Sequence, residues 1–514
     1  MASIFAALTG FVNKQAASNT ESSTDSSTGI NWDQVYKELA ELLGDRYVIR
    51  RKEELLTYEC DGLTSYRERP KMVALPNSTE QVSAVVKVCD RLNIPFVARG
   101  AGTGLSGGAL PVPDCVLIST TRMKRILKMD YENQQVVVQP GIINNWVTQA
   151  VSGKGFYYAP DPSSQIICSI GGNVAENSGG VHCLKYGVTT NHVLALTVVL
   201  PNGEITQLGG LVPEMPGYDL TGIFVGSEGT LGIATEVTLR ILRSPDCVKV
   251  ILADFTTMEA AGRAVADIIG SGVIPGGMEI MDNLSINAVE DVTGSACYPR
   301  DAEAVLLVEL DGLEVEVDAN IEKVRKICLD DGARDITVAI DPGDRKKLWQ
   351  GRKAAFAAAG KMSTNYYVQD GVVPRTKLAW VLREIAAISE KYNYQIANVF
   401  HAGDGNLHPL ILYDRSVPGV LETVEAIGGE ILKRCIQAGG SLSGEHGIGT
   451  DKQCYMGQMF SDIDLETMVW VTDAINTKGL ANPGKIFPTP RMCGEAANAA
   501  QKNPPEAFKN IENF

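Results

Sequence analysis

The sequence contains no long apolar run and no clustered cysteines. No stretch approaches the roughly 18 to 20 apolar residues of a membrane-spanning helix. The 11 cysteines lack C-x-x-C spacing, and their odd number argues against a disulfide framework. Iron–sulfur clusters need closely grouped thiolates, so we expect any such centre to lie in another polypeptide. We therefore predict a cytoplasmic protein, whose association with a membrane would go through a partner subunit or a surface contact.

Positive charge is also scarce. Lys and Arg number 46 against 61 Asp and Glu, which gives a formal net charge of −15. A field of this sign repels polyanions, so we expect no nucleic-acid partner. Residues 1–29 are rich in Ser and Thr and hold a single basic residue, Lys14, which fits neither a secretory signal nor an Arg-rich transit peptide. We expect this segment to be a disordered tail.

The remaining sequence indicates several domains with mixed helices and strands. A chain of 514 residues exceeds a single ordinary core, so we expect two or three domains. Apolar spacing predicts helices over residues 32–43 and 78–92, the second capped by Ser78. Short strands are expected over residues 72–76, 96–98, 115–120, 135–139, 192–200 and 231–241, with a hairpin turn at Pro201-Asn202-Gly203-Glu204.

Glycine density falls near Ser244-Pro245, where we place a domain boundary. Beyond it the pattern predicts strands over residues 250–255, 304–310, 335–340 and 396–400, and helices over residues 258–269, 314–330 and 377–392. This alternation predicts an α+β domain in which helices pack on one sheet.

Two glycine clusters mark the first half of the chain. Five glycines lie from Gly100 to Gly108 and four from Gly171 to Gly180. Glycine lets backbone N–H groups approach an anion, so such loops can form a cradle for a diphosphate, although a pair of tight turns is the simpler alternative. A Rossmann fingerprint is disfavoured, because Leu105 stands where its third glycine would fall and prolines interrupt any following helix.

The second half concentrates histidine in two short motifs. His401 and His408 flank the turn Gly403-Asp404-Gly405-Asn406, near what we expect to be the open end of a hairpin, and Glu445-His446 lies between two glycines. Cross-strand neighbours are close enough for two imidazoles to share one metal ion. Histidines that merely fill a core remain the alternative for this pattern.

Several of these segments together resemble a known family. The motifs are Arg99 to Gly108, Tyr158 to Ser164, Ser169 to Gly180, and Gly226 to Gly232. They resemble the FAD-binding domain of the vanillyl-alcohol oxidase superfamily, and residues 31–487 resemble its glycolate oxidase large flavin subunit branch, kin to D-lactate and D-2-hydroxyglutarate dehydrogenases. The resemblance implies an α+β fold, with a FAD-binding domain of two α/β subdomains over residues 30–245, to which residues 479–514 return. Residues 246–478 would form an α+β cap domain that carries the metal and the base.

The resemblance also implies a set of cofactor-binding residues. They are Arg99, Gly100, Ala101, Gly102, Thr103, Gly104, Pro160, Asp161, Ser163, Ser169, Gly171, Gly172, Asn173, Gly179, Glu228, Gly229, Gly232, Ile233 and Asn482. Covalent members of the superfamily carry a histidine about where Thr103 stands, so we expect FAD to be bound without a covalent bond.

The same resemblance assigns chemistry to the second half. It implies His401, His408 and Glu445 as ligands of a divalent metal, Zn²⁺ or Mn²⁺, and His446 as the base. Arg352 matches a substrate arginine that can clamp a carboxylate, although a solvated arginine on a helix face is the alternative. Relatives that oxidise a dicarboxylate carry a lysine near the position of Val368, so a short monocarboxylate is favoured.

These expectations lead to a FAD-dependent dehydrogenase that oxidises glycolate, or D-lactate, by metal-assisted deprotonation and hydride transfer. We expect electrons to pass to a quinone or to iron–sulfur and second flavin subunits, and a homodimer is compatible with the sequence. A flavin-binding subunit without turnover and a metal-free flavin oxidase are the alternatives.

Overall fold

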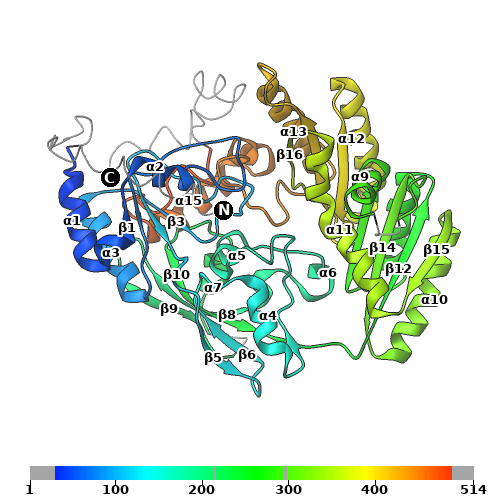
Figure 1. Cartoon of the computed structure of the whole chain (residues 1–514), viewed down its shortest axis with the longest axis horizontal. Coiled ribbons are helices and arrows are strands. Elements are labelled where there is room, and N and C mark those ends of the chain that lie inside the picture. Colours follow the sequence, from blue (N-terminus) through cyan, green and yellow to red (C-terminus); the bar gives the residue numbers. More distant parts are fainter. Residues whose placement is uncertain (1–28, 213–215, 295–297, 489–514) are drawn as a thin grey trace, which may run out of the picture.

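The computed structural model describes residues 29–212, 216–294 and 298–488 of the chain (Figure 1). The expected tail, apart from Gly29, lies outside these residues. Helices and strands are mixed throughout, so the predicted α+β class is confirmed. No helix within the described ranges combines the length and the apolar character of a membrane-spanning segment.

A small sheet opens the chain, with the strand order β1-β2-β4-β3. Strand β4 pairs in parallel with β2 and with β3, and Ser78 caps the helix between β2 and β3 as predicted, because its side chain accepts a hydrogen bond from the Gln81 N–H. The elements are α1 (Trp32–Leu43), β1 (Val48–Ile49), α2 (Lys52–Leu55), β2 (Met72–Ala74), α3 (Thr79–Leu92), β3 (Phe96–Arg99) and β4 (Val116–Ser119).

A second sheet, with the order β5-β6-β10-β8-β9, is antiparallel throughout. The predicted turn joins β8 to β9, and Gly203 has a φ of 84° there, a backbone conformation that favours glycine. The elements are β5 (Ile126–Asp130), β6 (Gln135–Val138), α4 (Asn144–Ser152), β7 (Phe156–Tyr157), α5 (Ile170–Glu176), α6 (Cys183–Tyr186), β8 (Val193–Val199), β9 (Ile205–Gly209), α7 (Leu220–Phe224), β10 (Ile233–Arg240) and β11 (Leu242–Arg243).

The second half is built on an antiparallel sheet of seven strands, in the order β15-β12-β14-β13-β17-β18-β16. Helices cover both faces: α8, α10, α12 and α13 pack on one, and α9 and α11 on the other. The elements are β12 (Cys247–Phe255), α8 (Met258–Gly270), β13 (Gly277–Asp282), α9 (Asn283–Thr293), β14 (Ala304–Gly312), α10 (Glu314–Asp330), β15 (Ala333–Ala339), α11 (Pro342–Met362), β16 (Asn365–Val368), α12 (Leu378–Tyr392), β17 (Ile396–His401), β18 (Asn406–Tyr413) and α13 (Val420–Gln437).

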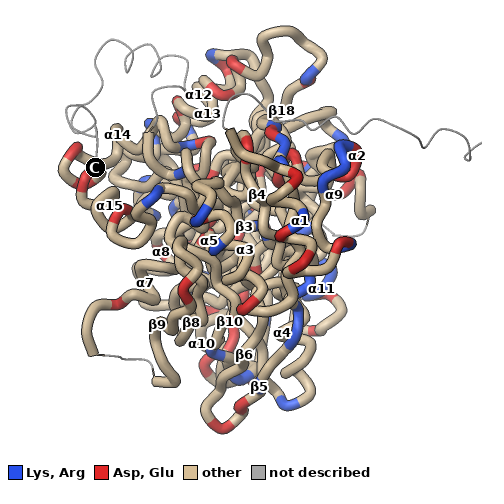
Figure 2. Tube along the Cα trace, turned by 90° about the vertical axis from the view of Figure 1, so that its left-hand side faces the viewer, with Lys and Arg blue, Asp and Glu red and all other residues tan. Residues whose placement is uncertain are grey.

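After α13 the chain runs back toward the first half (Figure 1). Helices α14 (Met456–Met459) and α15 (Asp462–Ile475) precede a bridge in which Ala481 pairs in parallel with Phe96 of β3. The seven-stranded sheet begins at Cys247, beside the expected boundary, while the division into domains stays a prediction. Acidic and basic residues are interspersed along the trace in Figure 2, so the net charge of −15 is not confined to one element.

Candidate active site

The two glycine clusters line the same cavity. Residues 98–105 form one wall of this cavity, and the first turns of α5 form another. The Ser169 side chain joins the walls, because its Oγ accepts hydrogen bonds from the backbone N–H groups of Ala101 and Gly172. The glycines are therefore more than isolated turns, since they bring two loops about seventy residues apart in the chain into contact.

The backbone of this cavity has no room for larger residues at key positions. A Cβ atom added at Gly171 would lie 2.6 Å from the Pro140 Cβ, and one at Gly102, where φ is +70°, would lie 2.3 Å from the Arg99 side chain. Arg99 itself is buried, and its Nη1 has no hydrogen-bond partner among the described residues. A buried, unpaired guanidinium beside close-packed backbone N–H groups fits an anion such as a diphosphate.

Most of the predicted cofactor residues line this cavity, but four do not. Pro160, Asp161, Gly179 and Asn482 are absent from its wall. The Asp161 carboxylate instead lies 3.0 Å from His182 Nδ1, and Asn482 Nδ2 donates to the backbone carbonyls of Gly108 and Glu228. These contacts of Asp161 and Asn482 join segments that are distant in the chain.

Glu176 lines the cavity and was not predicted. It ends α5 inside the second glycine cluster, so its place in that motif was the available signal. Burial, reinforced by the nearby Glu228 carboxylate, raises the pKa of Glu176 well above its usual range. Glu228 accepts hydrogen bonds from the N–H groups of Ile448 and Gly449, which ties the first half of the chain to the loop after Glu445.

Glu445 and His446 line this same cavity. His401 and His408 lie on the neighbouring hairpin of β17 and β18, close to its turn. The prediction that the two histidines lie near the open end of the hairpin is therefore wrong. In the strand register His401 lies opposite Asn406 and His408 opposite Val399, which makes the two histidines diagonal neighbours on one face. Their rings are perpendicular, with centroids 5.1 Å apart.

Glu445 joins these two histidines. Its Oε1 lies 3.3 Å from His401 Nε2 and 3.1 Å from His408 Nε2, while its Oε2 is buried without a hydrogen-bond partner among the described residues. Burial raises the pKa of Glu445, but the two imidazoles outweigh burial and hold it well below its usual range. One carboxylate and two imidazoles whose ligand atoms lie within 4.8 Å of one another fit a divalent metal ion.

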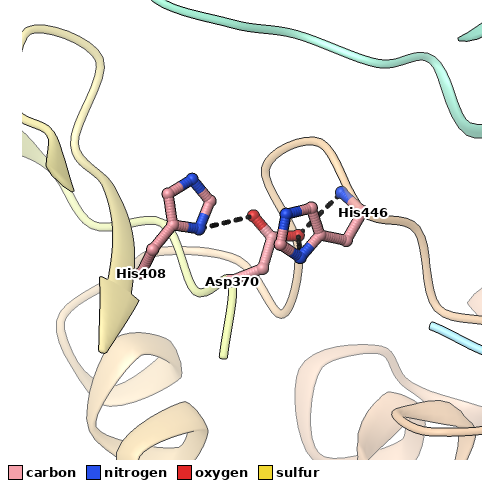
Figure 3. Close-up of side chains that lie close together, drawn as sticks. All are labelled: Asp370, His408 and His446. Carbon is pink, nitrogen blue, oxygen red and sulfur yellow. Dashed lines mark hydrogen bonds and ion pairs between the residues drawn. The ribbon is translucent and has the colours of Figure 1, made fainter. Parts of the chain in front are cut away.

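A second group of potential ligands consists of Asp370, His408 and His446 (Figure 3). Asp370 is fully buried, and its Oδ2 already accepts hydrogen bonds from Ser443 Oγ, from the His446 N–H and from the Lys452 ammonium. A cation at this carboxylate would compete with a lysine 3.2 Å away. We therefore assign Asp370 to holding the loop that carries Glu445 and His446.

His446 stacks on His408, with ring centroids 5.0 Å apart and an interplanar angle of 13°. Its Nε2 lies 4.0 Å from Glu445 Oε1, and its Nδ1 lies 3.9 Å from Asp370 Oδ2. Burial lowers the pKa of His446 to about 4, although the Asp370 carboxylate opposes the shift. A neutral imidazole at neutral pH can accept a proton.

Arg352 is not a solvated helix-face residue, since it is 2 % exposed. From α11 its Nε donates to Glu279 Oε2 at 2.6 Å, and its Nη2 forms an ion pair with the same oxygen at 2.6 Å. Glu279 also contacts His401 Nδ1 at 2.7 Å. Sequence reasoning missed Glu279, whose only signal was a carboxylate within the apolar run of β13.

Comparisons with known proteins match the two halves of the chain to two described domain families. Residues 70–209 match the family described as FAD binding domain, and residues 244–486 match FAD linked oxidases, C-terminal domain. The chain is 50 % identical over 467 residues to the glycolate oxidase subunit GlcD of Escherichia coli strain K12, covering 91 % of this chain and 93 % of that one. It is 38 % identical to GlcD of Bacillus subtilis, covering 84 % and 92 %, and 35 % identical to a D-lactate dehydrogenase of Anaerostipes hadrus, covering 82 % and 90 %.

Solved structures share the fold at low identity. A 4-ethylphenol oxidase from Gulosibacter chungangensis superposes with a TM-score of 0.76 at 19 % identity, covering 91 % of this chain and 98 % of that one. A p-cresol methylhydroxylase gives 0.75 at 19 % identity, with 88 % and 96 % covered. The predicted fold of the vanillyl-alcohol oxidase type is thereby confirmed.

Proposed function

The chain belongs to the FAD-linked oxidase family that includes the GlcD subunits, and we propose that it oxidises glycolate to glyoxylate, with D-lactate as the alternative substrate. The family identifies it as a FAD-dependent enzyme. The observation that carries the proposal is that Glu445 and His446 line the cavity of the glycine loops, so that a flavin and a metal-bound acid can share one space.

FAD fits the first part of this cavity. Arg99, with its unpaired Nη1, and the backbone of residues 100–104 and 171–173 would hold the diphosphate and the ring system without a covalent bond. Bound FAD supplies the acceptor for the two electrons that leave the substrate Cα as a hydride.

His401, His408 and Glu445 would hold a divalent ion, Zn²⁺ or Mn²⁺ by the nature of the ligands. The ion supplies a Lewis acid that lowers the pKa of the substrate hydroxyl. The unpartnered Oε2 of Glu445 is the feature of this chain that supports such an ion.

His446 is the proposed base. Its Nε2 faces the Glu445 carboxylate and would accept the hydroxyl proton, while its Nδ1 faces Asp370, whose negative charge stabilises the imidazolium that results. Loss of one proton to His446 and one hydride from Cα leaves the aldehyde of glyoxylate, so atoms and electrons balance.

Arg352 would hold the substrate carboxylate with its buried guanidinium, which the Glu279 carboxylate orients. Val368 is apolar and buried on β16, so this position offers no second cation for a dicarboxylate. Both features favour a small monocarboxylate.

Electrons are proposed to leave through a partner. The related proteins of E. coli and B. subtilis are named as subunits of glycolate oxidase, so this chain would work beside iron–sulfur or second flavin subunits, or reduce a quinone.

An anaerobic reduction series tests the proposal. FAD-loaded protein is mixed separately with glycolate, D-lactate, L-lactate and D-2-hydroxyglutarate, and flavin absorbance is followed. We expect fast bleaching with glycolate or D-lactate and slow or no bleaching with L-lactate and the dicarboxylate. If none of the four acids bleaches the flavin, the alternative of a flavin-binding subunit without turnover is favoured instead.

A further inference from the structure

Glu279 is a buried carboxylate beside the metal cluster. It lies on β13, directly opposite His401 of β17 in the strand register, and its side chain is fully buried. The residues around it include Met281 and Val399, which belong to the apolar core under α11. An ionised carboxylate in such a place is costly unless it is paired.

The two oxygens of Glu279 serve two different partners. Oε1 lies 2.7 Å from His401 Nδ1, and Oε2 accepts from Arg352 Nε at 2.6 Å. One rigid carboxylate thus contacts a proposed metal ligand and the proposed substrate arginine. The strand register holds the first contact, and the packing of α11 on the same face holds the second.

The contact at Nδ1 decides which nitrogen of His401 can bind a metal. When Nδ1 carries the proton and donates it to a carboxylate, Nε2 keeps its lone pair and the ring orientation is fixed. In this chain Nε2 is the nitrogen that faces Glu445. A carboxylate at this position also makes the imidazole a stronger ligand.

We propose that Glu279 is a positioning residue that fixes the tautomer and the orientation of His401 and, with its other oxygen, the guanidinium of Arg352. The inference rests on the proposed function, because it takes His401 as a metal ligand. It adds a residue that acts on metal affinity without contacting the ion.

The test measures metal affinity in FAD-loaded protein. Zn²⁺ is titrated against a chromophoric chelator in wild-type protein, in Glu279→Gln and in Glu309→Gln. Glu309 is the matched control, because it lies on the same face of the same sheet but pairs with His182 and Trp349. We expect Glu279→Gln to weaken Zn²⁺ binding about 10- to 100-fold with FAD content unchanged, and Glu309→Gln to bind Zn²⁺ as wild type does.

Loss of one partner from a buried ion pair destabilises a fold, and Glu279→Gln leaves the Arg352 guanidinium without its carboxylate. Variants that remove this guanidinium are therefore measured as well. Arg352→Met alone keeps the Glu279 contact with His401 and should retain Zn²⁺ affinity. The double variant Glu279→Gln/Arg352→Met should fold and bind Zn²⁺ as weakly as Glu279→Gln does.

Wild-type Zn²⁺ affinity in the double variant would overturn the proposal. Equal weakening in Glu279→Gln and Glu309→Gln, with loss of FAD from both, would also overturn it, since it would indicate general unfolding. The proposed function fails separately: protein that binds Zn²⁺ but is not reduced by any 2-hydroxy acid leaves the role of Glu279 intact. If the wild-type protein binds no divalent metal, both the proposed function and the proposed role of Glu279 fail.

Discussion

The flavin cradle (residues 99–104 and 169–173) and the metal cluster (His401, His408 and Glu445) face one cavity but are built in opposite ways. The cradle is mostly backbone, and its specificity comes from the absence of side chains at positions such as Gly171. The cluster consists of polar side chains beside a sheet: Glu279 contacts the His401 side chain, and Asp370 accepts from the Glu445 backbone N–H. Substitutions that add atoms to a glycine should therefore disturb the cradle, whereas substitutions that replace a polar side chain should disturb the cluster.

The largest effect is expected at His446, the proposed base beside the cluster. His446→Asn should retain FAD but slow flavin reduction by about 10² to 10⁴ fold, because the amide cannot accept the hydroxyl proton. Stopped-flow mixing with glycolate measures this rate. His192→Asn is the control, since His192 is also buried but contacts the Tyr186 carbonyl and should leave the rate unchanged. An unaltered rate in His446→Asn would move the base to another residue.

A smaller effect is expected from one added methyl group in the cradle. Gly171→Ala would place a Cβ 2.6 Å from the Pro140 Cβ, so α5 must shift, at a cost of about 1 to 3 kcal/mol in the free energy of unfolding. FAD content after gel filtration and thermal unfolding measure the consequence, and both should fall. Gly153→Ala meets no atom within 4 Å and should behave as wild type. Full FAD retention by Gly171→Ala would show that FAD binding does not depend on the close packing of Gly171 against Pro140.

The smallest effect lies where the two halves meet. His182 lies 3.0 Å from Asp161 in the first half and 2.9 Å from Glu309 in the second. Burial lowers the pKa of His182, but the two carboxylates outweigh burial and raise it well above its usual range. Because the folded pKa exceeds the unfolded value of about 6.5, the stabilisation is fully present below that pH and is lost as the pH rises through the folded pKa.

His182→Gln should therefore lower the free energy of unfolding by about 1 kcal/mol near pH 6, with a difference from wild type that shrinks toward alkaline pH. Urea unfolding at several pH values measures it. A difference that grows as the pH rises would contradict the assignment of a protonated His182 between two carboxylates.

The sequence predicted the cradle better than the cluster, for a physical reason. Glycine clusters and the Ser78 cap are local patterns, so residues 98–105 and the start of α3 could be expected from spacing alone. Asp161 and Asn482 were assigned to the cofactor, while their side chains bond to the backbone of His182 and Gly108, which a motif does not reveal.

The cluster depends on contacts between segments distant in the chain. His401 and His408 were found from their turn, yet their diagonal placement follows from a strand register that begins at the turn itself. Glu279 and Asp370 were missed because their importance arises from the sheet order β13-β17-β18-β16, which one sequence does not reveal. Arg352 was predicted from the family resemblance, but its buried contact with Glu279 was not predicted.

The central claim is that a metal ion and the flavin act on one substrate in one cavity, and anaerobic reduction with and without metal tests it most directly. FAD-loaded protein is treated with a chelator, mixed with glycolate or D-lactate under anaerobic conditions, and then supplied with Zn²⁺ or Mn²⁺. We predict that chelation abolishes bleaching while FAD stays bound, and that one of the two ions restores it. Equal bleaching rates before and after complete metal removal would contradict the account and favour a metal-free flavin oxidase.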